Sequence, residues 1–461
     1  MTRIAVEIAK KAPDWFEPGV MRFEQMLDGA RPALLRELGR QGFLEFLRQG
    51  FPATDQEDWR FTNLAPFTNG VFSPAVTQEF TLPSSAELER LLPLSGPRLV
   101  FVNGVLAKGL SDIDALPRGV TFLPLQEALT TRAAAPLISQ ELAQHCRIAE
   151  EPLAAFNTAF LHDGAVVKID AGADIPEVMQ VLYVSTEEAE DAAVFPRILL
   201  VAEQNSKCTV LEAYVGLGPN RYCTAAVTEL ILREGAVLNH LKLVLEGPGA
   251  LHLSTAHACV ARGGRLEAQA YTFGGRLVRN EAAVELSGEG AEVLLTGLSL
   301  LGGNQHVDNH TVIDHSKPHC SSREIYKGVY AEQSAGVFDG TIIVRPGAQK
   351  TAAYQANRSL LLSREAVVNS KPQLRIWADD VKCTHGATVG QIDEDALFYL
   401  RSRGIGCNEA YQMLTKAFVS EVLAEQKNQN HALSAWLETL VEKRLSELPR
   451  ALGADPKQPW G

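Results

Sequence analysis

The stretch GAVLNHLKLVLEGPGALHLSTAHACVARGG, residues 235–264, holds two short apolar runs that are each bounded by glycine-containing turns. Stretches of the same texture recur along the chain, and each begins at a turn and enters a strand-like run. They start at positions 205, 234, 263, 290, 318, 347 and 380. This regular spacing is typical of solenoid proteins, which stack one structural unit per repeat.

A stack of coils explains this repeat better than a sandwich does. One coil cannot bury its apolar face alone, whereas stacked coils share a continuous core. Within residues 263–271, apolar and polar side chains alternate as in a strand with one face toward a core. The predicted inward set is Leu266, Ala268 and Ala270, and the predicted outward set is Glu267 and Gln269. We predict a parallel β-helix over about residues 160–390, although an antiparallel meander would also give closely spaced short strands.

Helical patterns lie on both sides of the repeats. Before them, apolar residues recur at helical spacing until Phe51-Pro52; they are Leu34, Leu35, Leu38, Phe43, Leu44 and Leu47. A short strand is expected at Leu99–Val102, before Asn103-Gly104. The predicted domains are an N-terminal helical domain (1–95), a mixed connecting region (96–155), the β-helix core (156–390) and a C-terminal helical domain (391–461).

The C-terminal domain begins with DEDALFYLRSRG, residues 393–404. Its acidic first turn suits the positive end of a helix, and Gly404 is a suitable stop. A second helix is predicted directly afterwards. Its apolar face would carry Ala410, Leu414, Ala417, Phe418 and Val422.

The composition is that of an ordinary soluble protein. The 461 residues are 46% hydrophobic and carry a formal net charge of −12. This acidity argues against nucleic acid or an anionic membrane as the main partner. No apolar run reaches the roughly 20 residues that a membrane span needs. The first residues lack the features of a signal or transit peptide, so a cytoplasmic location is expected.

The seven cysteines are scattered and odd in number, which is not the pattern of a disulfide framework. They contain no C-x-x-C pair, so the chain has no self-contained zinc or cluster motif. The sequence also lacks a phosphate-binding loop, a dinucleotide-binding glycine motif and a nucleophile elbow. We therefore expect that the chain does not hydrolyse ATP itself.

Cys383 and His385 are the first candidate ligands. They occupy positions i and i+2 of the last repeat, so on a strand both side chains point to the same face, about 6.6 Å apart. Thiolate and imidazole are both good ligands for iron. Two ligands cannot hold a cluster that needs four, so a second chain would have to supply the rest. Alternatively, Cys383 packs in the core like Cys208 and Cys320, which lie at similar repeat positions.

A second group of possible ligands comprises His306, His310, His315, His319 and Cys320. On a helix, His306 and His310 could share a zinc ion, but the local pattern is that of a strand. Four residues along a strand span about 13 Å, which is too far for one ion. Ligands could still meet from neighbouring coils, which stack about 4.8 Å apart. We expect these five residues to be polar residues of the surface or of an interface rather than metal ligands.

Four stretches of the chain resemble the SufB/SufD family of iron–sulfur cluster assembly scaffolds. They are EDWRFTNL (57–64), NTAFLHDGAVV (157–167), HTVIDHSKPHCSSREIYKG (310–328) and SKPQLRIWADDVKCTHGATVGQIDEDALFYLRSRGI (370–405). In the last of these, KCTHGATVG is similar to the SufD form, whereas the SufB form tends to carry Glu-His-Glu-Ala-Thr. The family fold is a right-handed β-helix between helical terminal domains.

The resemblance implies a scaffold subunit that is not an enzyme, pairs with SufB and docks SufC, the partner that hydrolyses ATP. His385 would match the histidine implicated in nascent cluster formation at the SufB interface, with Cys383 beside it. The predicted SufC-docking residues are Phe398, Tyr399, Arg401, Arg403, Gly404 and Phe418. The iron–sulfur cluster would be transient and shared with SufB, and none is expected in the isolated chain. A flavin in the complex and a homodimer of the isolated chain are left open.

Two other functions are alternatives. A carbohydrate-active β-helix enzyme should carry acidic residues aligned across successive repeats, and none are evident in the sequence. A zinc hydrolase would use the histidines of residues 306–320. Metal analysis separates these interpretations, because the hydrolase requires stoichiometric zinc whereas the scaffold requires little metal in the isolated chain.

Overall fold

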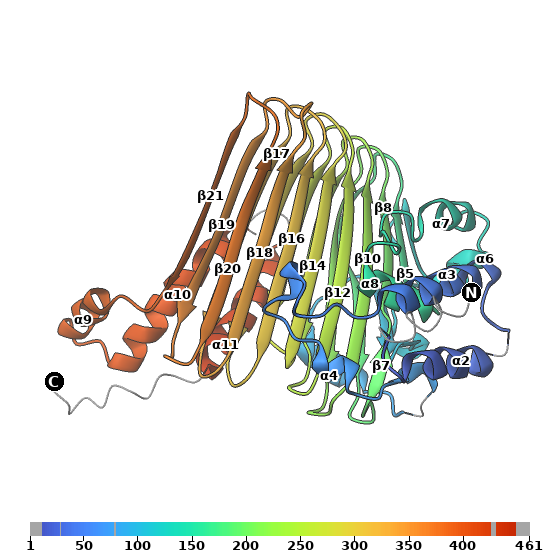
Figure 1. The fold of residues 1–461 in the computed structure, drawn as a ribbon, viewed down its shortest axis with the longest axis horizontal. Coiled ribbons are helices and arrows are strands. Elements are labelled where there is room, and N and C mark those ends of the chain that lie inside the picture. Colours follow the sequence, from blue (N-terminus) through green and yellow to red (C-terminus); the bar gives the residue numbers. More distant parts are fainter. Residues whose placement is uncertain (1–11, 28, 78–79, 426–429, 449–461) are drawn as a thin grey trace.

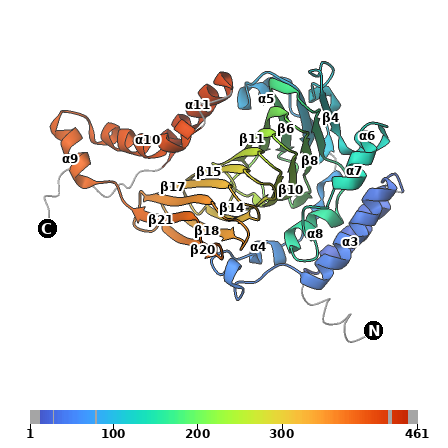
Figure 2. The same ribbon diagram turned by 90° about the horizontal axis from the view of Figure 1, so that it is seen from above.

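A β-helix forms the centre of the molecule (Figures 1 and 2). The computed structural model describes residues 12–27, 29–77, 80–425 and 430–448. Each coil contributes one strand to each of two parallel sheets. In sheet A, which contains one strand from each coil, the strands of the β-helix are β5 (Ala165–Ile169), β8 (Arg197–Ala202), β10 (Cys223–Leu232), β12 (Leu251–Val260), β14 (Leu277–Leu286), β16 (His306–His315), β18 (Ala335–Val344) and β20 (Val367–Ile376). Those of sheet B are β6 (Asp174–Ser185), β9 (Lys207–Gly216), β11 (Val237–Leu245), β13 (Arg265–Thr272), β15 (Glu292–Leu301), β17 (Ser321–Tyr330), β19 (Ala352–Leu361) and β21 (Lys382–Gly390).

The repeat seen in the sequence corresponds to sheet B. Each of the seven predicted starts lies shortly before one of the strands β9 to β21, and the second run of each repeat forms the next strand of sheet A. The pairing is parallel and in register, so that Val237 lies beside Arg265 and Arg265 beside Glu292. The predicted β-helix with helices at both ends is therefore confirmed.

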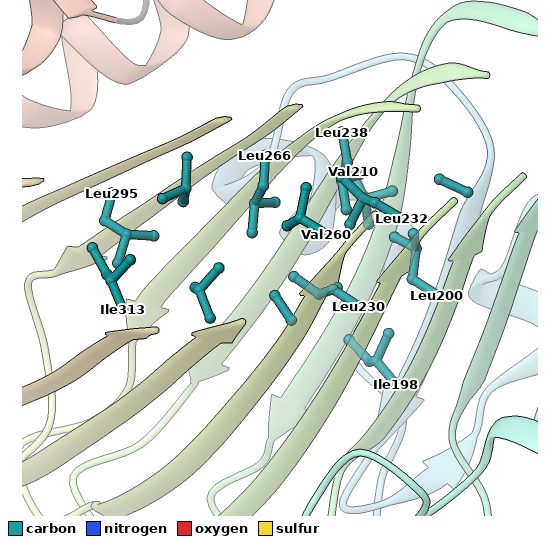
Figure 3. Packing of buried hydrophobic residues seen from close by; sticks show 14 of the residues in the cluster. Ile198, Leu200, Val210, Leu230, Leu232, Leu238, Val260, Leu266, Leu295 and Ile313 are labelled. Carbon is teal, nitrogen blue, oxygen red and sulfur yellow. The ribbon is translucent and has the colours of Figure 1, made fainter. Parts of the chain in front are cut away.

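Apolar side chains from alternate positions of both sheets form the core inside the β-helix (Figure 3). Leu200, Leu232, Leu238 and Leu266 are fully buried there. Stacking places the same strand position of successive coils side by side, so each inward residue contacts its counterparts in the neighbouring coils. A continuous core results, which no single coil could form.

Helices cover the outer faces of both sheets, and this changes the environment of outward residues. Glu267 and Gln269 of β13 are buried rather than exposed. Gln269 lines a small cavity with Leu433 and Leu437 of helix α11 (His431–Glu447). The sequence pattern gave the direction of these side chains correctly but could not reveal that a distant helix covers them.

The N-terminal helices pack on sheet A and on each other, except the helix at Ser85–Leu91, which packs on the outer face of sheet B through Leu88. They are α2 (Phe16–Leu27), α3 (Ala33–Gln49), α4 (Ala65–Thr68), α5 (Ser85–Leu91), α6 (Leu125–Thr130), α7 (Ala135–Glu141) and α8 (Pro152–Ala159). In α3 the buried face includes Leu35, Leu38 and Phe46, whereas Leu44, predicted on the apolar face, is half exposed. A Cβ at Gly42 would lie 2.6 Å from the Ala159 backbone nitrogen, so glycine permits the close approach of α3 to α8.

The two ends of the β-helix differ. At the start, β2 (Arg98–Val102) pairs with β6 and turns through Asn103 and Gly104, both with positive φ, into antiparallel β3 (Val105–Leu106). On sheet A, β4 (Val120–Pro124) pairs antiparallel with β5. The short strands β1 (Ser73–Pro74) and β7 (Ala192–Val194) extend sheet A beside β10. At the other end, β20 and β21 are the last strands of the described part of each sheet.

The C-terminal helices are α9 (Glu394–Ser402), α10 (Cys407–Glu425) and α11. Helices α10 and α11 pack against the outer face of sheet B, while α9 lies apart from both sheets (Figures 1 and 2). As predicted, α9 begins at an acidic turn capped by Asp393 and is followed by Gly404 with φ of 84°. The described helices include none with the length and hydrophobicity that crossing a membrane requires.

Candidate functional site at the open end of the β-helix

The last coil is uncovered. Each residue of β21 is exposed or half-buried, whereas most residues of β18 are buried. Among the large apolar side chains exposed on the described surface, four lie in or beside this coil: Val367, Ile376, Trp377 and Val389. The outer edges of β20 and β21 have no neighbouring strand among the described residues. Exposed apolar groups beside an unpaired strand edge are typical of a surface that another chain covers.

Cys383 and His385 both lie in this last coil. Cys383 is half-buried and packs against the interior core, and His385 is exposed. Because they stand two residues apart on a regular strand, their side chains leave the same face of the sheet, as predicted. The inner position of Cys383 continues the row formed by Cys208, Leu238, Leu266, Val293, Ser322 and Ala353.

This row supports one comparison made from the sequence and corrects another. Cys208 occupies the strand position of Cys383 six coils earlier. Cys320 does not, because Ser322 holds that position and Cys320 lies in the turn before β17. Its thiol donates to the Gly288 carbonyl at 3.2 Å. Cys383 differs from both of these buried cysteines because no further coil covers it.

Partial burial raises the pKa of the Cys383 thiol. A hydrogen bond from the backbone N–H of Ala353 lowers this pKa by a smaller amount. His385 belongs to a second inner row, two strand positions further along, which continues with Gln355 and then Glu324. Gln355 Nε2 and Thr311 Oγ1 donate to the Glu324 carboxylate at 2.8 and 2.6 Å. Burial raises the pKa of that carboxyl to about 6.

Helix α9 presents most of the residues predicted to dock an ATPase. Phe398 and Tyr399 are 73% and 57% exposed, and Arg401, Arg403 and Gly404 are exposed as well. The guanidinium of Arg403 lies 5.2 Å from the centre of the Tyr399 ring. These aromatic and basic groups together form a surface without apolar cover from the described chain, which suits an interaction with another protein.

Phe418 lies in a different environment from the α9 residues. It is half-buried, and the Lys327 ammonium of β17 lies 4.7 Å from the centre of its ring. Lys327 also donates to the Phe418 carbonyl at 2.6 Å and lies 2.7 Å from Glu421. These contacts attach α10 to sheet B. The role of Phe418 in partner docking stays a prediction, and it would have to coexist with this packing.

The histidines of residues 306–320 do not converge. His306 and His310 lie on the outer face of β16, whereas His315 is buried and its Nε2 lies 2.9 Å from Ser322 Oγ. His319 is exposed in a turn. The expectation that His306 and His310 lie along a strand, rather than on one face of a helix, is therefore confirmed. His310, however, has carboxylates from two other segments nearby.

Sequence reasoning missed the apolar rim of the open end. Trp377 and Val389 carry no motif chemistry, so they were not selected. The available signal was positional: apolar residues in the last repeat have no following repeat to cover them.

Comparison with known proteins places this architecture in a family. Residues 183–418 match the model for the SufBD core domain of SUF-system FeS cluster assembly, and residues 20–181 match the model for the SufBD N-terminal region. The chain is 32% identical to the iron–sulfur cluster assembly protein SufD of Escherichia coli, over 83% of this chain and 87% of that protein. It is 30% identical to an iron–sulfur cluster assembly SufBD family protein of Synechocystis, over 87% and 90%.

A chloroplastic protein of Arabidopsis thaliana, ABCI7, is 29% identical over 82% of this chain and 80% of its own length. The matches span both the helical N-terminal region and the β-helix. These matches define the class of the chain: it is a protein of SUF-system iron–sulfur cluster assembly. Within this class the chain belongs to the SufBD family.

Proposed function

We propose that the chain is a scaffold subunit that pairs with a SufB chain through its open last coil, so that a nascent iron–sulfur cluster forms at His385 and Cys383. The cluster is cargo, shared with SufB for a short time. The observation that carries the proposal is that both candidate ligands lie in the one coil whose strand edges and apolar residues are uncovered among the described residues. Family membership supports the partner's identity.

The chemistry follows from the two side chains. Cys383 would lose its proton on binding iron, because the thiolate is the ligand, and His385 would bind through a neutral imidazole nitrogen. Since two ligands leave positions on iron unfilled, the partner chain has to supply others. A related β-helix joined edge to edge with β20 or β21 would satisfy the unpaired backbone groups and bring its own ligands to the same place.

We further propose that α9 docks the ATPase SufC. The sequence has no phosphate-binding loop, so the partner would hydrolyse the ATP. Phe398 and Tyr399 offer apolar area, and Arg401 and Arg403 offer polar anchors at the same helix. The segment between β21 and α9 is short, so a movement of the docked ATPase would be transmitted directly to the last coil. A cytoplasmic location and a flavin in the complex stay predictions.

Co-expression of the chain with SufB and SufC tests the pairing surface. Trp377→Glu and Val389→Glu place charges at the open end, where both residues are exposed in the isolated chain. The matched control is Val71→Glu, which charges an exposed apolar residue in the N-terminal region. We expect the two end variants to lose SufB in size-exclusion chromatography with light scattering, while the control retains it. Retention of SufB by both folded end variants would refute the proposed pairing surface.

The same measurement on the isolated chain distinguishes a homodimer. If the open end pairs two copies when SufB is absent, Trp377→Glu should convert the dimer to a monomer. A dimer unaffected by Trp377→Glu would use another surface.

A further inference from the structure

A charged cleft lies between the N-terminal segment and the outer face of sheet A. It has a volume of about 380 Å³, and its lining includes Asp58, Asp308, Asp339 and Lys371. Residues 57–62 pack here against the outer face of β14, β16 and β18, because they contact Arg279, Asp308 and Asp339. Trp59 anchors this segment, because its ring is buried beneath the Arg279 guanidinium at 3.7 Å. The cleft is thus formed by two parts of the chain that lie far apart in the sequence.

Three potential metal ligands meet in this cleft. One ligand atom each from Asp58, His310 and Asp339 lie within 4.8 Å of one another. His310 and Asp339 are direct register partners on the adjacent strands β16 and β18, and Asp58 comes from the segment 57–62. An imidazole with two carboxylates is a ligand set that suits divalent first-row transition metals.

The balance of charge around the cleft favours an added cation. The carboxylates outnumber the permanently charged cations in contact with them. The carboxylates are Glu57, Asp58, Glu281, Asp308 and Asp339, and the cations paired with them are Arg279 and Lys371, while Arg60 also lines the cleft. Both cations are shared between acidic partners. Lys371 Nζ lies 2.7 Å from Glu57 and 3.1 Å from Asp339.

Asp308, which lines the same cleft, provides an independent observation. Its side chain is 1% exposed, and its Oδ2 accepts from Thr62 Oγ1 at 2.6 Å and from Arg279. Its Oδ1 is buried and has no hydrogen-bond partner among the described residues. A buried, unpaired carboxylate oxygen is costly, so a partner for it is expected in the cleft.

Arg279 does not compete strongly for His310. It donates to Glu281 at 2.7 and 2.9 Å, to Asp308, and to the Asp58 carbonyl at 3.0 Å. Its contact with His310 Nδ1 is longer, at 3.3 Å. Replacing that contact with a metal bond would leave the guanidinium with its carboxylate partners.

We propose that Asp58, His310 and Asp339 bind a divalent first-row transition metal ion that fastens the N-terminal segment to the β-helix. Asp308 Oδ1 accepts a hydrogen bond from a water on this ion. The site lies on the outer face of sheet A and uses none of the residues assigned to the nascent cluster, so it stands or falls independently of the proposed function.

Titration of the full-length chain with Mn²⁺, after removal of any histidine tag, tests the site. The electron paramagnetic resonance signal of free Mn²⁺ reports binding. We expect one site in the unaltered chain and an affinity lowered at least about tenfold in His310→Gln, Asp339→Asn and Asp58→Asn. Asp55→Asn is the matched control, because Asp55 is exposed in the same segment but lies outside the ligand group.

Hydrogen exchange distinguishes an ion that fastens residues 57–62 to the β-helix from an ion that binds at the surface without holding this segment. With Mn²⁺ bound, the amides of residues 57–62 should exchange more slowly, and Asp58→Asn should abolish this slowing. Circular dichroism confirms that His310→Gln, the mildest change, is folded. The proposal is overturned if the chain binds no Mn²⁺, if folded His310→Gln binds it with unchanged affinity, or if exchange in residues 57–62 is unaffected.

Discussion

At the scale of single residues, position within the stack decides what a side chain can do. Cys208 and Cys383 share one inner row, yet six coils separate a fully covered thiol from one at the open end. His385, two positions further along the strand, is exposed. A residue that would be core in the middle of the β-helix therefore becomes available for chemistry in the last coil.

We expect His385→Ala to lower cluster formation in the complex with SufB and SufC without unfolding the chain. The side chain is exposed. A surface substitution of this kind should change the unfolding free energy by no more than about 0.5 kcal/mol. Cluster yield measured by absorbance and iron content, beside a thermal melt, checks this. His431→Ala, an exposed histidine on α11, is the control. Undiminished cluster yield in His385→Ala would contradict the assignment of His385.

Cys383→Ser separates a ligand from a packed residue. Because Cys383 is half-buried against the core, some loss of stability is expected in either case. If the thiol ligates iron, cluster yield should fall more than the melt predicts and approach that of His385→Ala. If the thiol only packs, the yield should follow stability.

Glu324 gives the chain a specific pH dependence. Burial raises the pKa of its carboxyl from 4.5 to about 6, so the folded state binds this proton more tightly than the unfolded state does. Stability from this residue is therefore greatest at low pH and falls as the pH rises from about 4.5 through 6. The loss is about 2 kcal/mol, at about 1.4 kcal/mol per pKa unit.

Glu324→Gln should remove that dependence. The amide imitates the protonated acid, and the unpaired Oε1 of Gln355 offers it an acceptor. We expect the variant to be more stable than the unaltered chain at pH 8, by up to about 2 kcal/mol, and similar to it at pH 4.5. Urea unfolding at the two pH values checks this, and an equal difference at both would show that Glu324 does not titrate as described.

Residue directions could be read from the sequence, but residue environments could not. The alternation in β13 correctly placed Leu266 inside, because the strand period is two. The burial of outward Gln269 depends on α11, which lies far along the chain and leaves no local pattern in β13. The same holds for the meeting of Asp58 with His310, which depends on how the N-terminal segment packs on sheet A.

At the scale of elements, the two helices that follow the β-helix differ, because α9 is exposed and α10 packs on sheet B. Helix α10 attaches to sheet B through Val419, Val422 and the contacts of Phe418 with Lys327. No residue of α9 is buried. The helical pattern identified both helices, but it did not distinguish the helix that packs from the one that stands free.

Paired aspartate substitutions separate these two roles. Phe398→Asp should abolish SufC binding and leave the thermal melt unchanged, because its ring is 73% exposed. Phe418→Asp should destabilise the chain, since it places a carboxylate where a ring packs against sheet B. Pull-down with SufC and circular dichroism on both variants check this. Retained SufC binding in folded Phe398→Asp would exclude α9 as the docking element.

At the scale of the whole molecule, buried polar contacts join the helical region directly before the β-helix to its first coils. Arg197 of β8 and Glu229 of β10 form an ion pair at 2.5 Å with side chains no more than 1% exposed. Arg197 also donates to Asn157 of α8 at 3.1 Å, and Glu229 accepts from the Ala143 backbone at 3.0 Å. Unfolding of either part would break these contacts, so the two parts should unfold together.

Arg197→Met should therefore cost about 3–5 kcal/mol, because it leaves the Glu229 carboxylate buried without its cation. Replacing both residues, as Arg197→Met with Glu229→Met, should recover a large part of that loss. Denaturant unfolding followed in parallel by tryptophan fluorescence and circular dichroism checks both the cost and the single transition. A double variant less stable than Arg197→Met alone would contradict this account.

The repeat itself was the most informative feature of the sequence for the whole molecule. The spacing of the repeat starts between residues 205 and 380 predicted every strand of sheet B from β9 onward, because stacking imposes one period on all coils. The contribution of β2 and β4 to the start of the β-helix was not predicted. These short strands lie outside the period, and only their pairing with β6 and β5 places them there.

The difference between the two ends of the β-helix limits what it can build. At the start, the short antiparallel strands β3 and β4 end the parallel ladders, whereas at the other end of the described chain each ladder stops at a full-length parallel strand, β20 or β21, so continuation by further parallel strands is favoured there. A subunit with two open ends could polymerise into a fibre, whereas under the proposed pairing with SufB a single open end would be used up in a pair. Copies made in excess of the partner would then keep a bare end, which makes the relative dosage of the two proteins a matter of solubility for the cell.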